Sequence, residues 1–142
     1  MTISVRRWLL LILAAIAAYV GAWALLAPAA WYDTFPGAGH HWLPILGAYN
    51  EHLARDVGGL YLALAALSVG AAARAADGYL VRLAAIAWLV FSVPHLVYHL
   101  GHLGVYAGLD RAGNAVSLSV VVLLGVALLI PVRTRDTAAV AG

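Results

Sequence analysis

Four long apolar runs constrain the fold of this chain more than any other feature of its sequence. They cover residues 8–27, 57–73, 83–103 and 115–132. Each approaches the ~20 residues that an α-helix needs to cross about 30 Å of hydrocarbon, and none alternates in the manner of a barrel strand. With the polar residues that precede some of them, we expect helices at about 8–27, 51–73, 79–103 and 111–132. The predicted fold is an all-α, four-transmembrane-helix bundle, forming a single membrane domain over residues 1–142 with a short cytoplasmic tail at 133–142.

Composition supports a membrane protein. Of the 142 residues, 65% are hydrophobic and 10% are charged, against roughly 25% charged in an average soluble domain. A soluble fold of this size could not cover so much apolar surface, so the lipid bilayer is the expected surrounding. Cysteine is absent, which excludes disulfides and thiolate metal sites. The formal charge of +2 is too small to indicate a nucleic-acid partner.

The arginines predict the orientation. Six of the eight fall on one side of the predicted bundle: Arg6, Arg7, Arg74, Arg82, Arg133 and Arg135. Only Arg55 and Arg111 fall on the other side. The positive-inside rule therefore predicts a multi-pass protein of the cell membrane with both termini in the cytoplasm. A cleaved signal peptide over about residues 1–30 is the alternative, but its apolar stretch is longer than the ~7–15 residues of the apolar region of a signal peptide.

Ionisable side chains gather at the opposite end of the predicted bundle. His95, His99 and His102 stand at i, i+4 and i+7, which places them on a single stripe of one helix. On the preceding helix Glu51 and Arg55 are four residues apart, as are His52 and Asp56. Because the two helices run antiparallel with a rise of about 1.5 Å per residue, Glu51 is expected level with His102, and Asp56 level with His99 and His95. Asp110 and Asn114 enter the last helix from the same surface.

Imidazole and carboxylate without sulfur form the ligand set of zinc, copper, iron or manganese. The expected metal ligands are Glu51, His52, Asp56, His95, His99 and His102. The residues expected to orient a cofactor or bind an anion beside them are Arg55, Tyr98, Asp110 and Asn114. If the protein is an enzyme, the metal would activate water or oxygen against a lipophilic small molecule that enters from the bilayer. No complete metalloenzyme motif such as HEXXH is present.

Two other functions fit the same residues. One is a haem b electron carrier in which His52 faces a histidine of the following helix. The other is a structural or accessory subunit whose polar groups lock helices together through hydrogen bonds worth about 0.6 kcal/mol each. His40 and His41 are expected to be loop residues rather than ligands. A small-residue stripe at Gly59, Ala63, Ala66 and Gly70 is expected to pack within the bundle, with a homo-oligomer as the alternative.

A family resemblance is carried by the segment PILGAYNEHLARDVGGLYLAL at 44–64, by WYD at 31–33 and FPG at 35–37, and by HLVYHLGHL at 95–103. Together these segments resemble a group of small four-helix membrane proteins of actinobacteria, which are loosely similar to DoxX-like proteins in layout. The resemblance covers most of the chain. It implies the four-helix fold and the importance of the two polar segments, and it implies no activity.

Overall fold

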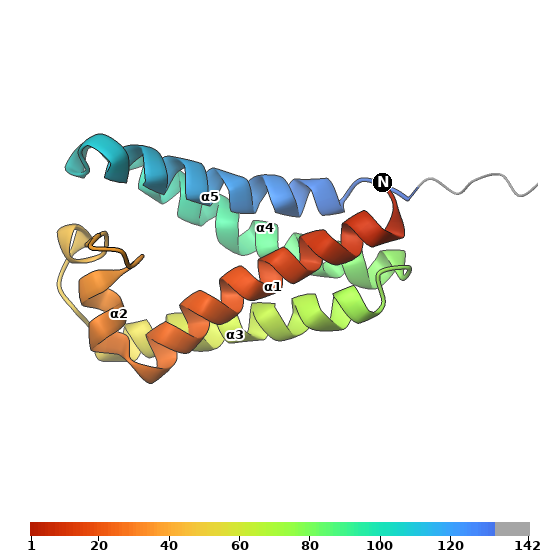
Figure 1. Cartoon of the computed structure of the whole chain (residues 1–142), viewed down its shortest axis with the longest axis horizontal. Helices are drawn as coiled ribbons and strands as arrows, with labels where there is room; N and C mark the ends of the chain where they lie inside the picture. The colour runs from red at the N-terminus through yellow and green to blue at the C-terminus, as the bar shows by residue number, and fades with distance from the viewer. Residues whose placement is uncertain (133–142) are drawn as a thin grey trace, which may run out of the picture.

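A computed structural model describes residues 1–132 of the chain (Figure 1). The elements in chain order are α1 (Ile3–Leu26), α2 (Pro28–Thr34), η1 (Pro44–Leu46), α3 (Glu51–Ala73), α4 (Gly78–Gly101), η2 (Leu103–Val105) and α5 (Gly108–Leu128). Four of these helices, α1, α3, α4 and α5, are long and apolar enough to cross a membrane. The predicted all-α, four-helix architecture is confirmed. The expected tail at 133–142 lies outside the described residues.

Polar caps set where three of the long helices begin. The Thr2 hydroxyl accepts a hydrogen bond from the Val5 N–H, so α1 begins at Ile3, five residues before the expected start. Asn50 caps α3 in the same way through the Leu53 N–H, and α3 has the bounds that were expected. Asp77 caps α4. Side-chain acceptors satisfy N–H groups that the first helical turn leaves free, which explains why the helices extend beyond their apolar runs.

Helix α1 packs mainly on α3, at a crossing where two glycines bring the backbones together. A Cβ built on Gly58 would lie 2.6 Å from the Leu25 nitrogen, and one built on Gly21 would lie 2.9 Å from the Gly58 oxygen. One turn before Gly58 in α3, the Arg55 Nη1 donates a hydrogen bond to the Leu25 carbonyl oxygen at 2.5 Å. The crossing therefore tolerates no side chain at either glycine.

The small-residue stripe of α3 does not take part in that packing. Gly59, Ala63, Ala66 and Gly70 are all exposed, and among the described residues no heavy atom lies within 4 Å of a Cβ built on Gly59 or Gly70. The expectation that this stripe packs inside the bundle is wrong, because α3 turns Gly58 toward α1 instead. A homo-oligomer that packs through the stripe stays a prediction.

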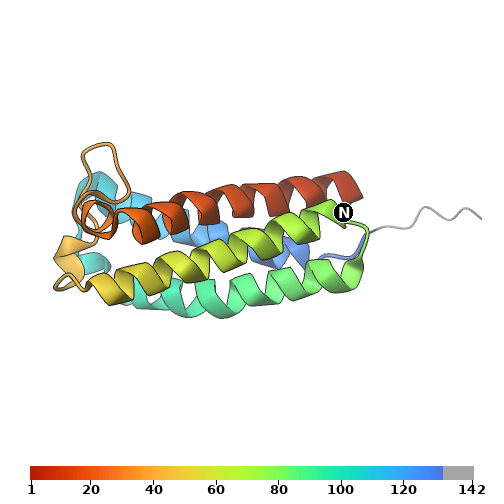
Figure 2. The same ribbon diagram turned by 90° about the horizontal axis from the view of Figure 1, so that it is seen from below.

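The second helix pair is α4 with α5, which meet at Gly125 against Leu89. The two pairs join at a core centred on Trp88, whose Nε1 donates a hydrogen bond to the Ser68 hydroxyl at 2.9 Å. Figure 1 shows that the first turns of α3 and the last turns of α4 are apart, at the end of the molecule that carries α2 and the 35–50 loop. In the same view α3 and α4 lie closer together toward the opposite end, where residues 74–77 join them; Figure 2 shows this joining turn from below. This divergence decides which polar residues can meet.

Candidate functional site

The polar residues at the start of α3 pair with one another. Arg55 forms a salt bridge with Glu51, with Nη2 and Oε1 2.8 Å apart. His52 Nε2 lies 3.3 Å from Asp56 Oδ2, and these two side chains are 88% and 56% exposed. The i, i+4 spacing therefore forms contacts along α3, as expected. It leaves Glu51, His52 and Asp56 on the surface, each with its polar partner on its own helix.

The histidines of α4 lie in two environments. His102 is exposed; its ring stacks on Tyr98 with centroids 4.1 Å apart, and its Nδ1 donates to the Tyr98 carbonyl oxygen at 2.7 Å. His95 and His99 lie deeper, with ring centroids 4.6 Å apart. His95 also stacks on Phe91 at 5.3 Å. The His95–His99 pair is thus the part of the stripe that turns into the protein.

The six expected metal ligands are not brought into one centre. Within residues 1–132, no group of three or more histidine, aspartate or glutamate side chains could hold a metal ion. The physical reason is the divergence of α3 and α4 (Figure 1). Matching depth along two helices does not place side chains together when the helices separate and the acidic face turns outward.

A buried polar pair does form between α4 and α5. His99 is 6% exposed and Asn114 is 2% exposed, and the Asn114 amide interacts with the His99 imidazole. His99 Nδ1 and Asn114 Oδ1 are nevertheless both buried, and neither atom has a hydrogen-bond partner among the described residues. An unsatisfied buried polar atom costs about 1–3 kcal/mol, so these two atoms call for an explanation.

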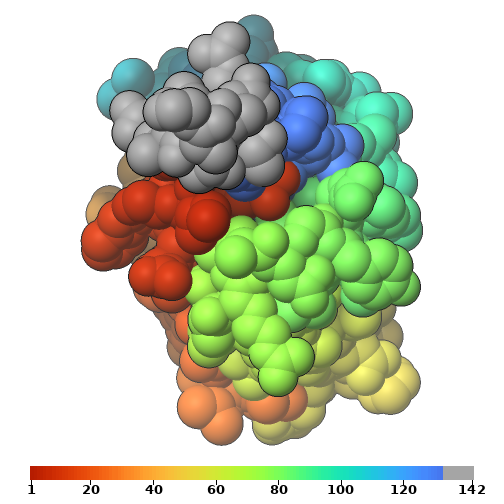
Figure 3. All heavy atoms as spheres, turned by 90° about the vertical axis from the view of Figure 1, so that its right-hand side faces the viewer, coloured from red at the N-terminus to blue at the C-terminus, as the bar shows by residue number. Residues whose placement is uncertain are grey.

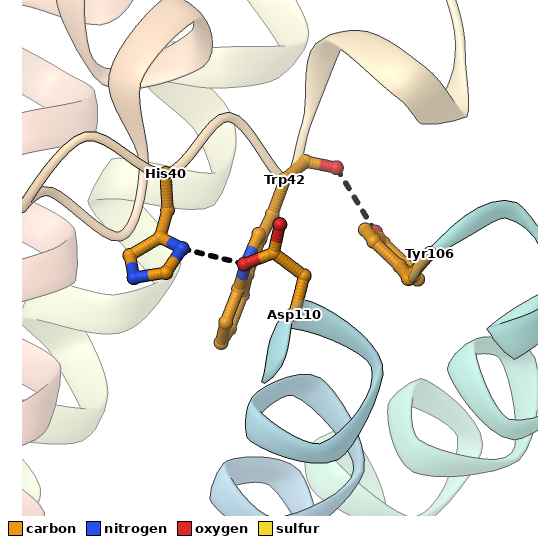
Figure 4. Close-up of polar contacts among 4 residues, drawn as sticks. All are labelled: His40, Trp42, Tyr106 and Asp110. Carbon is orange, nitrogen blue, oxygen red and sulfur yellow. Dashed lines mark hydrogen bonds and ion pairs between the residues drawn. The ribbon is translucent and has the colours of Figure 1, made fainter. Parts of the chain in front are cut away.

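A second polar cluster joins the 35–50 loop to α5 (Figure 4). His40 Nδ1 donates a hydrogen bond to Asp110 Oδ1 at 2.5 Å, and Trp42 Nε1 donates to the same oxygen at 2.9 Å. The Tyr106 hydroxyl donates to the Trp42 carbonyl oxygen at 2.9 Å. Burial raises the pKa of Tyr106, which keeps this phenol in its donating form. The cluster holds the loop against the start of α5.

This loop cluster was only partly expected. Asp110 was predicted as a site residue, whereas His40 was assigned to the loop without a role, and Trp42 and Tyr106 were missed. The available signal was topological, because His40 and Asp110 were both predicted to lie at the same surface. Because Nδ1 carries the ring proton and donates it to the carboxylate, Nε2 of His40 holds the lone pair. Carboxylate partners impose the same tautomer on metal-binding and basic histidines. His40 and Asp110 are 39% and 40% exposed, so solvent screens the pair.

The loop cluster also adjoins the buried pair. Trp42 lies against α5 at Gly113, where a built Cβ would be 3.1 Å from Trp42 Cζ2. Gly113 precedes Asn114 in the chain, so the indole lies directly beside the helix segment that carries the buried amide. Trp42 therefore packs against the turn of α5 that also carries Asn114.

A scan against protein-family models and searches of curated proteins and of solved structures find no match to this chain. The resemblance to the actinobacterial group stays an expectation from the sequence motifs. The fold and the site alone define the class: a multi-pass membrane protein with polar groups buried between two of its spanning helices.

Proposed function

We propose that this protein binds a transition-metal ion between α4 and α5, through His95, His99 and Asn114. One observation supports the proposal most directly: His99 Nδ1 and Asn114 Oδ1 are both buried and have no hydrogen-bond partner in the described chain. Polar groups inside a membrane bundle are costly and are commonly functional. We also propose that the protein lies in the cell membrane with both termini in the cytoplasm, because most of its arginines fall on that side.

Both unpartnered atoms can present a lone pair. With the ring proton on Nε2, His99 Nδ1 presents a lone pair, and an amide oxygen presents two. A cation satisfies both at once. His95, whose ring centroid is 4.6 Å from that of His99, supplies a second imidazole. Two imidazole nitrogens and one oxygen suit zinc, copper or iron and leave a coordination position open. An open position within the bilayer would suit a lipophilic small molecule.

This ligand set is smaller than the one expected from the sequence. Glu51, His52 and Asp56 are omitted because each has its partner on the surface of α3. His102 is omitted because it is exposed and bonded to the Tyr98 carbonyl. Asn114, which the sequence predicted as an orienting residue, is a ligand in this proposal. Arg55, expected to orient an anion, is bonded to Glu51 and to Leu25.

A structural role is the second candidate, and a specific pattern favours it. Several polar side chains bond to groups of a neighbouring helix or helix end: Arg7 to the Ala72 carbonyl, Arg55 to the Leu25 carbonyl and Trp88 to the Ser68 hydroxyl. In this alternative a water molecule satisfies His99 and Asn114, and the pair fixes the register of α4 on α5. It predicts no metal.

The test is metal content measured by elemental analysis of purified protein. Wild type, His99→Ala and Asn114→Ala are exposed to zinc, copper, iron or manganese and then desalted, with His52→Ala as the control because His52 is an exposed histidine of α3. Wild type and His52→Ala should retain stoichiometric metal, and the two site variants should lose it. Acidification should release the metal, because a protonated imidazole has no lone pair to donate.

Two results would decide against the proposal. Wild-type protein that stays metal-free after every exposure, combined with a lower melting temperature of His99→Ala, supports the structural role. Equal loss of metal from His52→Ala and His99→Ala would show that α3 is needed as much as α4, so the metal would not be held between α4 and α5 alone. A Soret band in the visible spectrum of the wild type would identify haem b.

A further inference from the structure

The arginine-rich end of the bundle contains a pocket of about 260 Å³. Its lining residues are Arg6, Gly78, Arg82, Leu129, Pro131 and Val132. They come from the start of α1, the start of α4 and the segment that follows α5, which meet at the end of the molecule that Figure 3 faces. The volume lies below the ~300 Å³ of the smallest drug-sized sites. A pocket of this size suits a small ion or a single headgroup.

Two guanidinium groups converge on the first residue of α4. A Cβ built on Gly78 would lie 3.9 Å from Arg82 Nη2 and 4.0 Å from Arg6 Nη1. Gly78 also opens a helix of 24 residues, whose N-terminus carries a partial positive charge. Asp77 already accepts hydrogen bonds from the Tyr79 and Leu80 N–H groups, so the two arginines supply most of the positive field. The Arg6 and Arg82 side chains and the N-terminus of α4 therefore all favour a negative charge beside Gly78.

Arg6 has a buried donor that nothing in the described chain satisfies. The residue is 5% exposed. Its Nη2 donates to the Ile130 carbonyl oxygen at 3.1 Å, whereas its Nε is buried and has no partner within residues 1–132. The ion pairs of this part of the chain involve other residues than Arg6 and Arg82. A buried guanidinium without a counter-charge is costly, so an anion in the pocket would relieve it.

We propose that this pocket binds a phosphate group, either as free phosphate or as the headgroup of an anionic lipid. Guanidinium groups bind phosphate oxygens through paired, charge-assisted hydrogen bonds. The N-terminus of α4 adds the favourable dipole of the helix. Leu129 and Val132 give the pocket an apolar wall, against which the glycerol part of a lipid could pack. The shared chemistry of both sources is a tetrahedral phosphate between Arg6 and Arg82.

The experiment uses the full chain purified in detergent and has two arms. Inorganic phosphate is titrated by calorimetry, with chloride as the control anion. Separately, protein reconstituted in mixed phosphatidylglycerol and phosphatidylcholine vesicles is released for native mass spectrometry, which counts each retained lipid. Arg82→Gln removes one guanidinium, whose one hydrogen bond within residues 1–132 goes to the Gly78 carbonyl of its own helix. Arg74→Gln removes the same charge from an exposed residue at the same end of the bundle, outside the pocket lining.

Arg82→Gln should weaken binding by about tenfold or more, as expected for loss of one charge-assisted hydrogen bond, and Arg74→Gln should leave it nearly unchanged. Gly78→Ala should weaken binding without changing any charge, because its methyl group occupies space between the guanidiniums. Calorimetric binding assigns free phosphate, and retention of phosphatidylglycerol alone assigns the lipid. Equal losses in Arg82→Gln and Arg74→Gln, or no binding by the wild type in either arm, would overturn the proposal.

Asp136 provides one more discriminating variant, because it is the only acidic side chain that follows Val132 in the sequence. If wild-type protein binds no phosphate in either arm and Asp136→Asn does, the chain's own carboxylate occupies the pocket and the proposal is wrong. Unchanged affinity in Asp136→Asn supports an external anion.

Discussion

Replacing Gly58 with alanine should destabilise the bundle, because α1 leaves no room for a side chain there. The new Cβ would lie 2.6 Å from the Leu25 nitrogen and 2.9 Å from the Leu25 Cα. These neighbours are backbone atoms, which cannot rotate away as a side chain would, so the helices must separate. Overpacking of this kind costs about 1–3 kcal/mol. Separation would also lengthen the 2.5 Å hydrogen bond from Arg55 to the Leu25 carbonyl.

Gly59→Ala is the matched control, one residue along the same helix. Among the described residues no heavy atom lies within 4 Å of a Cβ built on Gly59. Both variants gain the same helix propensity, up to about 1 kcal/mol for alanine over glycine. That gain cancels in the comparison, so the difference between the two variants is the steric cost, about 1–3 kcal/mol.

The assay is reversible unfolding of the detergent-solubilised protein by a denaturing detergent, followed by circular dichroism. Gly58→Ala should unfold at a lower denaturant fraction than wild type, and Gly59→Ala at the same or a higher fraction. If the free energies of unfolding of the two variants agree within about 0.5 kcal/mol, the range of neutral surface substitutions, then α1 and α3 do not cross at Gly58 as closely as described.

Two further predictions concern the loop end of the bundle. Asp110→Ala removes the acceptor shared by His40 and Trp42, so amide hydrogen exchange across residues 35–46 should accelerate about tenfold, the effect of losing roughly one charge-assisted hydrogen bond. Asp33→Ala removes an exposed carboxylate at the same end and should change the exchange much less; equal effects would argue against the cluster. Cytoplasmic reporters fused after Gly142 should be active and those inserted in the 36–41 loop inactive, whereas the reverse pattern would invert the proposed orientation.

The number and type of the long helices could be predicted because each apolar run has the length of a membrane span. Helix ends were less predictable, since they depend on single capping residues such as Thr2. The short helix α2 was missed. It spans Pro28–Thr34 and is too short to show a hydrophobic period, and its first position is held by a proline, which suits a helix start.

Sequence spacing predicted contacts within a helix but not between helices. The Glu51–Arg55 and His52–Asp56 pairs form as expected, because i, i+4 neighbours share a face in any α-helix. Their expected approach to His99 failed, because the start of α3 packs on α1 at Gly58 and lies apart from the end of α4, an arrangement that residue spacing does not reveal. His40 and Asp110 are 70 residues apart, so no local pattern could connect them.

The two proposed sites have opposite requirements and lie near opposite ends of α4. His99 and Asn114 offer lone pairs that a cation would satisfy, and Arg6 with Arg82 offers donors that an anion would satisfy. The rise from Gly78 to His99 is about 30 Å at 1.5 Å per residue, close to the thickness of the hydrocarbon core. Sites this far apart without shared partners are expected to act additively. Arg82→Gln should therefore leave metal content unchanged and His99→Ala should leave phosphate affinity unchanged, so each variant serves as the folding control for the other site.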